Sequence, residues 1–541
     1  MVGLILGAFA LLFYLNRPAP TPPLKEEDFS AIKNSDIKKL GYGIAVDNPK
    51  ALEVGLDILK KGGNAVDAAI AVAYVLGVVE PYGSGIGGGG IMLVHPQNEK
   101  EPIVYDYRET APSELKKGRT VGIPGFVRGM EEIHQDFGTM DLEKLIEPSI
   151  ELAEEGFEVS RTLHNRLSYA SYRLPVGKLP HFFPGGKAIL AGKEIKQEEL
   201  AKTLRKIQEK GSDVFYKGEI GEQIDINNQG IRLEDLGDYK TRKTKAISTN
   251  FQGYKLHVPP PPSGGVMLIQ SLLMADYLDV GKLNNDSSDY VQLMGEINRI
   301  SNKERHQYVG DPEFEDIPTE KLISEEHIAE LAANVTLEGF SEEHTTESDT
   351  IEDEFEEGST THFVVIDKNG MMVSATNTLS NFFGSGYYVA GFFLNNQLDN
   401  FSTTSRSPNR IEPGKRPFSH IAPTILAIGD KPVIGIGSSG GSRIVTVLSQ
   451  VLSKSIMLEQ SLETAVKGNR FYMNVSDNLV ALESTTSKNI DEELSNRGYR
   501  IDRSLAPIYF GGVEALMIDY TEGHIYGASD PRRDGVWKAY N

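Results

Sequence analysis

Cysteine is absent from the 541-residue sequence, and this absence excludes several classes of function. Without cysteine the chain has no disulfide bond, no thiol nucleophile and no cysteine ligand for a metal ion. The sequence is also poor in positive charge, with 55 Lys and Arg against 76 Asp and Glu and a net charge of −21. This balance argues against nucleic-acid binding, because phosphate contacts need clustered basic residues. A local arginine pocket for an anionic substrate stays compatible with it.

Motifs for metals and nucleotides are missing as well. The eleven histidines show no ligand spacing, and neither H-E-x-x-H nor a P-loop occurs. Residues 83–90 do contain G-x-G-x-x-G, with Asp106 downstream. A dinucleotide site needs the order strand, glycines, helix, whereas the order expected here is helix, glycines, strand. We therefore expect no metal and no cofactor, and we expect these glycines to let backbone segments approach closely.

The N-terminus carries an uninterrupted apolar run over residues 2–15, followed by a proline-rich stretch over 18–23. The run is shorter than the roughly 20 residues of a full membrane span. It fits the core of a signal peptide, although a basic n-region and a clear cleavage site are missing. An uncleaved membrane anchor through residues 2–15 stays open beside it. Both interpretations predict an extracytoplasmic protein, secreted or anchored to the outer face of a bacterial cell membrane.

Periodicity and capping signals predict a mixed α/β chain after residue 40. Asn48 and Asn64 are predicted to cap two consecutive helices, the second over residues 65–79 and almost wholly apolar. Residues 130–330 are predicted to be mostly helical, with one strand. The predicted strands cover residues 41–46, 91–95, 103–107, 253–258, 361–367, 371–377, 513–520 and 524–528. Helices combined with hairpin-linked strands indicate a layered α/β fold with the sheets inside.

The most informative junction follows an acidic segment. Nine acidic residues and no Lys or Arg lie between Glu342 and Glu357, and the predicted strand begins directly after Ser359 and Thr360. A threonine hydroxyl there could attack the preceding carbonyl and release a new chain that starts with the threonine. The freed α-amine, with a pKa near 7.7–8, would then suit the role of general base. From the residues alone, a Ser-Thr-Thr run that merely begins a strand is the alternative.

A second nucleophile candidate is Ser439, in the G-x-S-x-G string at residues 437–441. The string follows a strand-like run, precedes a helix-like run, and has Asp519 and His524 downstream in the order of a hydrolase triad. Against it, only about 100 residues follow the string, whereas a nucleophile elbow normally lies early in its domain. A glycine-rich turn is the alternative.

Several segments together resemble the γ-glutamyltransferase family, in order from about residue 41 to residue 541. These segments are residues 62–69, 84–90, 106–112, 359–363, 383–386, 394–397, 437–443 and 527–532. Residues 380–383 and 532–537 are most similar to the bacterial branch that processes capsular poly-γ-glutamate. With this resemblance, the G-x-S-x-G string is interpreted as accidental, because Ser439 stands where the family usually has proline.

The resemblance implies an αββα four-layer sandwich of the N-terminal-nucleophile hydrolase type, formed by two fragments of one precursor. Residues 1–40 would be a signal or anchor with a linker, 41–359 the large subunit and 360–541 the small catalytic subunit. The two fragments would stay associated. The implied activity is a γ-glutamyl acyltransferase and hydrolase that forms an ester on Thr360 and passes it to water or an amine acceptor, on poly-γ-glutamate. The alternatives are a glutathione γ-glutamyl hydrolase or transpeptidase, and an inactive homologue that binds polymer.

The resemblance also implies roles for individual residues. Cleavage after Ser359 would free Thr360 as nucleophile, Thr378 would orient it, and the N–H groups of Gly440 and Gly441 would form an oxyanion hole. The residues expected to bind substrate are Arg108, as a clamp for the α-carboxylate, with Ser380, Gln397, Asn400, Ser419, His420, Arg443 and Arg533.

Three positions depart from the glutathione-acting members, and the first of them points to a different donor. Asn400 stands where those enzymes hold the free α-ammonium of the donor with an acidic residue. Ser380 replaces an asparagine, and Ser419 with His420 replaces a serine pair. A residue inside poly-γ-glutamate has no free α-ammonium, since its α-nitrogen is already an amide. A neutral Asn400 therefore predicts a preference for polymer over glutathione.

Overall fold

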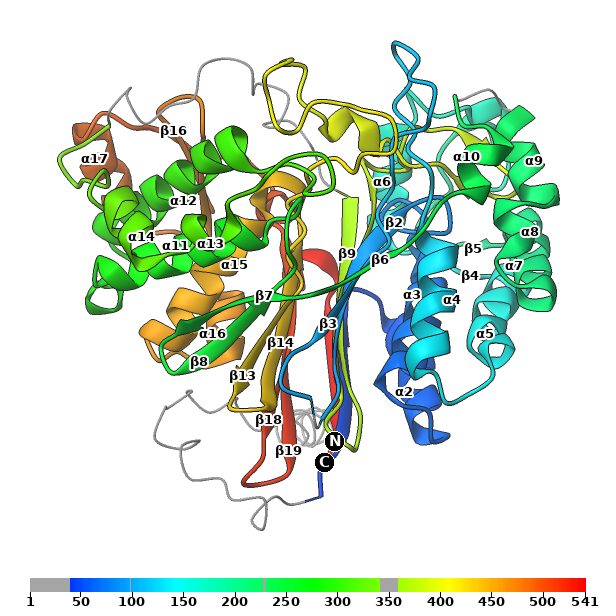
Figure 1. The fold of residues 1–541 in the computed structure, drawn as a ribbon, viewed down its shortest axis with the longest axis horizontal. Helices are drawn as coiled ribbons and strands as arrows, with labels where there is room; N and C mark the ends of the chain where they lie inside the picture. Colours follow the sequence, from blue (N-terminus) through cyan, green and yellow to red (C-terminus); the bar gives the residue numbers. More distant parts are fainter. Residues whose placement is uncertain (1–38, 98, 227–229, 341–358) are drawn as a thin grey trace, which may run out of the picture.

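The computed structural model describes residues 39–97, 99–226, 230–340 and 359–541. Two sheets pack face to face, and helices cover both outer faces, which gives four layers (Figure 1). The predicted αββα sandwich is therefore confirmed. The apolar run 2–15 and the acidic run 342–357 lie outside the described residues. None of the described helices is long and apolar enough to cross a membrane.

The first sheet has seven strands in the order β20-β1-β9-β10-β2-β3-β6. Strand β9 (Ser359–Ile366) lies inside this sheet, between β1 (Tyr42–Val46) and the middle strand β10 (Met372–Ser380). The outer strands are β20 (Val536–Tyr540), β2 (Gly89–His95), β3 (Ile103–Asp106) and β6 (Arg242–Lys245). All pairs are antiparallel, and every residue of β9 is buried, as expected for a strand covered on both faces.

The second sheet has six antiparallel strands in the order β19-β18-β14-β13-β8-β7. These strands are β19 (His524–Ser529), β18 (Gly512–Asp519), β14 (Lys431–Ser439), β13 (Thr424–Ile428), β8 (Tyr254–Val258) and β7 (Ile247–Phe251). Apolar side chains of both inner faces, such as Val364 and Ile436, form one core between the sheets. Burial of this core holds the two sheets against each other.

Helices from the N-terminal part cover the first sheet, and later helices cover the second (Figure 1). On the first sheet lie α2 (Pro49–Lys60), α3 (Ala65–Val79), α4 (Phe126–Phe137) and α5 (Leu142–Glu155). Asn64 and Asp67 form a capping box at the start of α3, which is nearly fully buried. On the second sheet lie α11 (Gly265–Tyr277), α12 (Ser288–Tyr308) and α15 (Ile444–Leu452).

The remaining elements are short and lie around these layers. They are α6 (Arg161–Ala170), α7 (Glu198–Lys210), α8 (Asp213–Tyr216), α9 (Glu219–Ile226), α10 (Leu233–Gly237), α13 (Thr319–Leu322), α14 (Glu325–Ala332), α16 (Leu462–Lys467), α17 (Asn489–Asn496), β4 (Phe157–Glu158), β5 (Glu194–Ile195), β11 (Tyr388–Val389), β12 (Phe392–Phe393), β15 (Phe471–Met473), β16 (Leu479–Leu482), β17 (Arg500–Asp502), and the 3-10 turns η8 (Gln397–Asn400), η9 (Gly441–Arg443) and η12 (Pro531–Arg533).

The predicted hairpins and capped helices are confirmed, but the expectation of one strand within 130–330 is wrong. The chain adds β6 and β7 to the sheet margins, and β4 and β5 form a small pair. The sequence of β6 is Arg-Lys-Thr-Lys, and β7 lies at the edge of the second sheet. Edge strands alternate less clearly in hydrophobicity, because one side of the strand and part of its faces meet solvent.

Candidate active site

The two threonines predicted to act together lie side by side at one end of the first sheet. Thr360 on β9 is in register with Thr378 on β10, and their hydroxyl oxygens are 3.4 Å apart. Thr378 donates its hydroxyl to the carbonyl oxygen of Ser359 over 2.8 Å. The Ser359 hydroxyl donates to the carbonyl of Tyr82. The peptide bond between Ser359 and Thr360 is thus held from both sides, with the Thr360 hydroxyl beside it.

A bulge in β10 completes this arrangement. The register shifts between Thr378 and Ser380, and Ser380 has a left-handed backbone with φ of 76°. This conformation is uncommon for a residue with a Cβ and marks a constrained position. The Ser380 backbone N–H donates to the Thr378 hydroxyl oxygen over 2.9 Å. Since that oxygen accepts from Ser380, its own proton is directed at the Ser359 carbonyl.

A pocket in front of these threonines gathers residues from five separate stretches of the chain. Its lining consists of Thr360, Thr378, Ser380, Gln397, Asn400, Ser419, His420, Ile421, Gly441 and Ile444. The structure thereby brings together eight of the predicted site residues. Ile421 and Ile444 are apolar lining that the sequence patterns did not single out, since buried isoleucines carry no chemical signature.

Gln397 is the most distinctive side chain of this pocket. It is fully buried, and neither its amide nitrogen nor its amide oxygen has a hydrogen-bond partner within the described part of the chain. Its neighbour Asn400 accepts from the Ser380 hydroxyl over 3.3 Å. Buried amide groups are normally satisfied, so a buried, unsatisfied one at a pocket wall is available to a ligand. Gln397 offers one donor group and one acceptor at this wall.

Two glycines form the turn between β14 and α15 at the pocket. Gly440 has φ of 143° and Gly441 has φ of 59°, both in the region that favours glycine. A Cβ on Gly440 would lie 3.0 Å from the Cα of Gly511, so this turn also packs tightly. Gly441 lines the pocket, and Gly440 precedes it in the chain without lining the pocket. The turn therefore brings backbone rather than side chains to the nucleophile.

Arg108 does not line the pocket. It is fully buried, and its guanidinium forms two hydrogen bonds with Asp106, of 2.9 and 2.7 Å. Its remaining nitrogen donates to the carbonyls of Pro262 and Pro417. Although burial alone would raise it, Arg108 and Arg416 together hold the pKa of Asp106 well below its ordinary value. A substrate carboxylate would have to displace one of these contacts to be clamped by Arg108.

The two other predicted arginines, the buried Arg443 and the half-buried Arg533, lie in a charged cluster beside the pocket. Arg443 follows Gly441 and stacks on the ring of Tyr509 at 4.5 Å. Arg533 is electrostatically coupled to Asp47 and to Arg443. Burial raises the pKa of Asp47 to about 7, with Arg533 acting against this shift. Burial also raises the pKa of Glu514, and the nearby Asp47 carboxylate adds to the rise.

The Ser439 triad is not assembled. Ser439 is buried at the end of β14, where its hydroxyl donates to the Gly512 carbonyl over 3.4 Å. Asp519 and His524 pair with each other at the opposite end of the β18–β19 hairpin. Asp519 lies seven residue steps along β18 from Gly512, which corresponds to roughly 23 Å. The Asp519 carboxylate instead accepts from the backbone of Thr521 in the hairpin turn.

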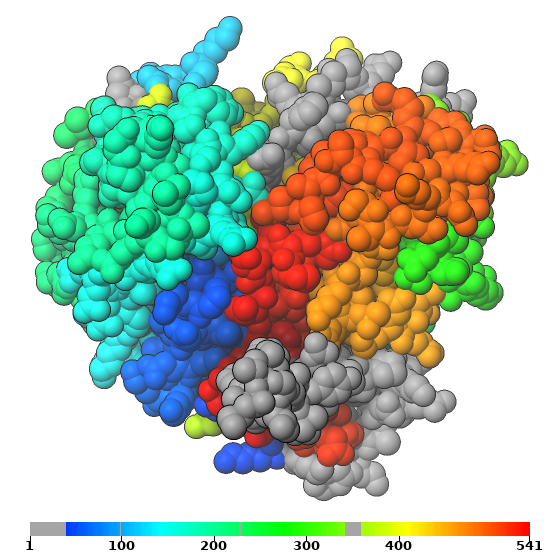
Figure 2. Space-filling model, turned by 180° about the vertical axis from the view of Figure 1, so that it is seen from behind, coloured from blue at the N-terminus to red at the C-terminus, as the bar shows by residue number. Residues whose placement is uncertain are grey.

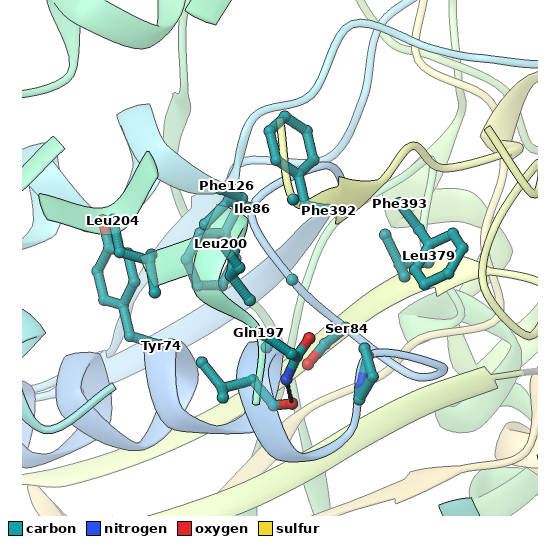
Figure 3. Close-up of a pocket in the computed structure, with 15 residues that line it drawn as sticks. Tyr74, Ser84, Ile86, Phe126, Gln197, Leu200, Leu204, Leu379, Phe392 and Phe393 are labelled. Carbon is teal, nitrogen blue, oxygen red and sulfur yellow. Dashed lines mark hydrogen bonds between the residues drawn. The ribbon is translucent and has the colours of Figure 1, made fainter. Parts of the chain in front are cut away.

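A second hollow lies between α3, α7 and the β11–β12 hairpin, and it differs in chemistry from the first (Figure 3). Figure 3 shows the rings of Phe126, Phe392 and Phe393 around it, and Ser84 and Gln197 at one end. The Gln197 amide donates to the Val78 carbonyl over 2.7 Å. No carboxylate or basic side chain lines this hollow. The Ser84 hydroxyl therefore has no basic or acidic side chain in the described lining to activate it, and we assign this hollow to packing.

Comparisons with known proteins agree with this geometry. The sequence model of the family described as Gamma-glutamyltranspeptidase matches residues 51–540. The chain is 41% identical to the capsule biosynthesis protein CapD proenzyme of Bacillus anthracis, over 94% of each chain. It is 33% identical to the glutathione hydrolase proenzyme of Bacillus subtilis, over 99% of this chain and 97% of the relative.

A solved structure supports the fold as well. The cephalosporin acylase from Bacillus halodurans superposes with a TM-score of 0.83 at 27% sequence identity, and the match covers 95% of this chain and 98% of the acylase. The family match, the curated relatives and the N-terminal-nucleophile hydrolase fold agree with one another. The chain therefore belongs to the gamma-glutamyltranspeptidase family, and it is a γ-glutamyl hydrolase and transferase.

Proposed function

We propose that the chain is a self-cleaving enzyme whose donor is poly-γ-glutamate. The observation that carries this proposal is the pocket that places Thr360, Thr378, Gln397 and Asn400 together without an acidic side chain among its lining. Cleavage would divide the chain into a large subunit, 41–359, and a small catalytic subunit, 360–541, which stay associated. The paired strands β1 and β9 would then belong to different subunits, and their pairing would hold the fragments together.

The cleavage step follows from the contacts around Ser359. The Thr360 hydroxyl oxygen attacks the Ser359 carbonyl carbon, and its proton passes to the Thr360 nitrogen as the C–N bond breaks. Thr378, which donates to that carbonyl oxygen, stabilises the negative charge that develops on it. The resulting ester between Ser359 and the Thr360 oxygen is hydrolysed by water. The products are a carboxylate on Ser359 and a free α-amine on Thr360.

The catalytic cycle uses the same hydroxyl. The α-amine of Thr360 takes the hydroxyl proton while the oxygen attacks the γ-carbonyl of the donor. The N–H groups of Gly440 and Gly441 would donate hydrogen bonds to the oxyanion. The leaving amine receives the proton, and a γ-glutamyl ester remains on Thr360. Water or an amine acceptor then attacks this ester and restores the free hydroxyl.

The donor preference is argued from the amides at the pocket wall. A glutamyl residue inside the polymer presents an amide at its α-nitrogen, with one N–H group and one nearby carbonyl. Gln397 has one free acceptor and one free donor, and Asn400 is neutral. A free α-ammonium, as in glutathione, would leave a charge without a counter-charge in this pocket. The substrate carboxylates would meet Arg443 and Arg533, with Ser419 and His420 shaping the wall.

Two other functions stay as alternatives. A glutathione hydrolase or transpeptidase would use the same nucleophile, and the match to glutathione hydrolase proenzymes favours it. An inactive homologue would bind polymer without cleaving it. For location, we propose an extracytoplasmic enzyme, secreted or anchored to the outer face of a bacterial membrane through residues 2–15. A capsular polymer lies outside the cell, so the proposed donor supports this location.

The test is a comparison of donors with the purified, cleaved enzyme. We expect a higher kcat/KM for poly-γ-glutamate than for glutathione, and Asn400→Asp should move the ratio towards glutathione. Asn284→Asp is the matched control, because it adds the same charge at an exposed position before α12. Turnover of glutathione without cleavage of polymer would overturn the polymer proposal, and the lack of any turnover would favour the inactive homologue.

A further inference from the structure

In one segment of this acidic protein, all Lys, Arg, Asp and Glu positions are occupied by Lys or Arg. Residues 159–193 contain six Lys and Arg and no Asp or Glu, in a chain with a net charge of −21. We call this stretch the basic segment. Its cations are Arg161, Arg166, Arg173, Lys178, Lys187 and Lys193. Such a local excess of one charge sign attracts ligands of the opposite sign, whatever the net charge of the whole protein.

The basic segment forms one compact unit on the surface. It begins with α6 and returns along that helix: the Val159 backbone N–H donates to the Lys193 carbonyl, and a His164 ring nitrogen lies 2.8 Å from the Ile189 carbonyl oxygen. Tyr169 and Tyr172 are 55% and 79% exposed, and their rings contact each other edge to face. The surface of the basic segment therefore carries exposed aromatic rings as well as cations.

Four of the cations are exposed and available. Arg161, Lys178, Lys187 and Lys193 are exposed, and none of them forms an ion pair within the described ranges. The other two, Arg166 and Arg173, contact residues of the 382–384 loop. Acidic residues do flank the segment in sequence, at Glu158 and Glu194. The four exposed cations are the ones left to meet a ligand from solution.

The basic segment contacts the loop that follows the pocket residue Ser380. The Arg166 guanidinium lies 3.8 Å from the ring centre of Phe382, two residues beyond the pocket residue Ser380. Arg173 donates to the Gly384 carbonyl over 2.9 Å, further along the same loop. Figure 1 shows α6 beyond the end of the sheet at which β9 begins.

A second contact joins the basic segment to the C-terminal region. The Thr162 hydroxyl donates to Asp534 over 2.6 Å, and Asp534 follows Arg533. From behind, the cyan-to-teal surface that includes this segment adjoins the red C-terminal residues (Figure 2). The basic segment therefore contacts the 382–384 loop, which follows the pocket residue Ser380, and Asp534, which follows η12. A donor that extends from the pocket past these two segments would meet the basic segment.

We propose that the basic segment is a docking surface for the part of a polyanionic donor that extends beyond the pocket. This inference rests on the proposed polymer donor and adds a second contact region to it. Each residue of poly-γ-glutamate carries one α-carboxylate, so the chain presents a regular row of anions. Exposed cations on flexible side chains suit such a row, since they can pair with successive carboxylates without a fixed register. The exposed tyrosines offer their rings to the methylene groups of the polymer.

The test replaces the four exposed cations together, in the variant Arg161→Gln, Lys178→Gln, Lys187→Gln and Lys193→Gln. Arg166 and Arg173 stay, because they hold the loop at the site. The matched control is Lys60→Gln, Lys61→Gln, Lys282→Gln and Lys368→Gln, which removes the same charge from exposed positions elsewhere. Kinetics are measured on γ-glutamyl-p-nitroanilide and on poly-γ-glutamate of several lengths, at low and high salt.

We expect KM for long polymer to rise about tenfold in the variant at low salt, a modest part of the range that electrostatic steering spans. At high salt the difference should shrink, because exposed charges are screened. The small donor and the control variant should be unaffected. Equal KM for polymer in the variant and the unmodified enzyme would overturn this inference alone. Failure of the unmodified enzyme to cleave polymer would overturn the proposed donor instead.

Discussion

Gln397 and Arg108 are both expected to bind the donor, both are fully buried, and yet they lie in opposite situations. Gln397 lines the pocket with both polar atoms unsatisfied, whereas Arg108 has its guanidinium engaged by Asp106 and two carbonyls. Among the described residues, no carboxylate, Lys or Arg side chain lines the pocket, whereas Arg108 lies outside the lining with its guanidinium already paired. We therefore expect Gln397 to bind the donor through neutral hydrogen bonds, and Arg108 with Asp106 to stabilise the structure around the site.

The largest expected effect is on stability, and it comes from removing the Arg108 side chain from its contacts with Asp106. Arg108→Ala leaves the buried Asp106 carboxylate without its two-pronged partner, so we expect a loss of about 3–5 kcal/mol in the free energy of unfolding. Denaturant unfolding measures it. Arg205→Ala, which breaks an exposed pair with Glu154, is the control and should cost no more than about 1 kcal/mol.

If Arg108 acts instead as the predicted clamp for the donor carboxylate, Arg108→Ala should affect kinetics rather than stability. If Arg108 holds the donor carboxylate, Arg108→Ala should retain its stability and its cleavage into two fragments. Its kcat/KM should instead fall about tenfold to a hundredfold for every γ-glutamyl donor, the range for one charged hydrogen bond. That outcome would mean that Arg108, like Gln397, binds the donor, and that its contacts with Asp106 are not needed for stability.

A second prediction concerns the hydroxyl that holds the scissile carbonyl. Thr378→Val keeps the shape of the side chain but removes the donor to the Ser359 oxygen. We expect self-cleavage to slow by about 10²–10³-fold, as for the loss of one oxyanion donor. Gel electrophoresis over time follows the conversion. Thr376→Val, which disturbs the same strand at His362, should still cleave, and an unchanged rate in Thr378→Val would remove Thr378 from this step.

A third prediction separates backbone strain from catalysis at the glycine turn. Gly441→Ala and Gly429→Ala introduce a Cβ at nearly the same φ, 59° and 58°, but Gly429 lies in the β13–β14 hairpin with open space around it. Both should lose about 1–2 kcal/mol of stability through strain. Only Gly441→Ala should also lower kcat. Equal kcat in the two variants would argue against an oxyanion role for this turn.

The smallest expected effect is a pH dependence from the charged cluster. Burial raises the pKa of Asp47 to about 7, so the folded protein binds a proton there that the unfolded chain releases near pH 4. This contribution to stability is present below pH 4 and is lost as pH rises through about 7. Asp47→Asn should flatten the curve of Tm against pH in that window, by roughly 1–3 °C. Identical curves would mean that Asp47 is not protonated there.

Much of the fold followed from local signals in the sequence. Asn48 and Asn64 cap the helices they were expected to cap, and the hairpin that carries Thr360 and Thr378 appears where alternation predicted it. The edge strands β6 and β7 did not follow, because polar edge strands resemble loops in composition. Their place is set by pairing with β3 and β8, which is a property of the whole fold.

In the site as well, some features could be predicted from the sequence and others could not. The resemblance to the family supplied most residues of the pocket, and the structure gathers eight of them around Thr360. The resemblance did not predict the hydrogen-bond partners of Arg108 or the buried carboxylates near Arg533. Asp47 and Glu514 lie far apart in sequence, and a single carboxylate in a strand carries no signal of burial. Such contacts depend on how the two sheets meet, and only a structure gives them.

The central claim, that the Ser359–Thr360 bond is cut by Thr360 itself, is tested most directly by the N-terminal sequence and mass of the purified protein. We predict two associated fragments, with the smaller one starting at Thr-Thr-His-Phe. Thr360→Ala should remain a single inactive chain, while Thr360→Ser, which keeps a hydroxyl, should still be cut. Cleavage of Thr360→Ala at the same bond, or an active unmodified enzyme that stays in one piece, would contradict the account.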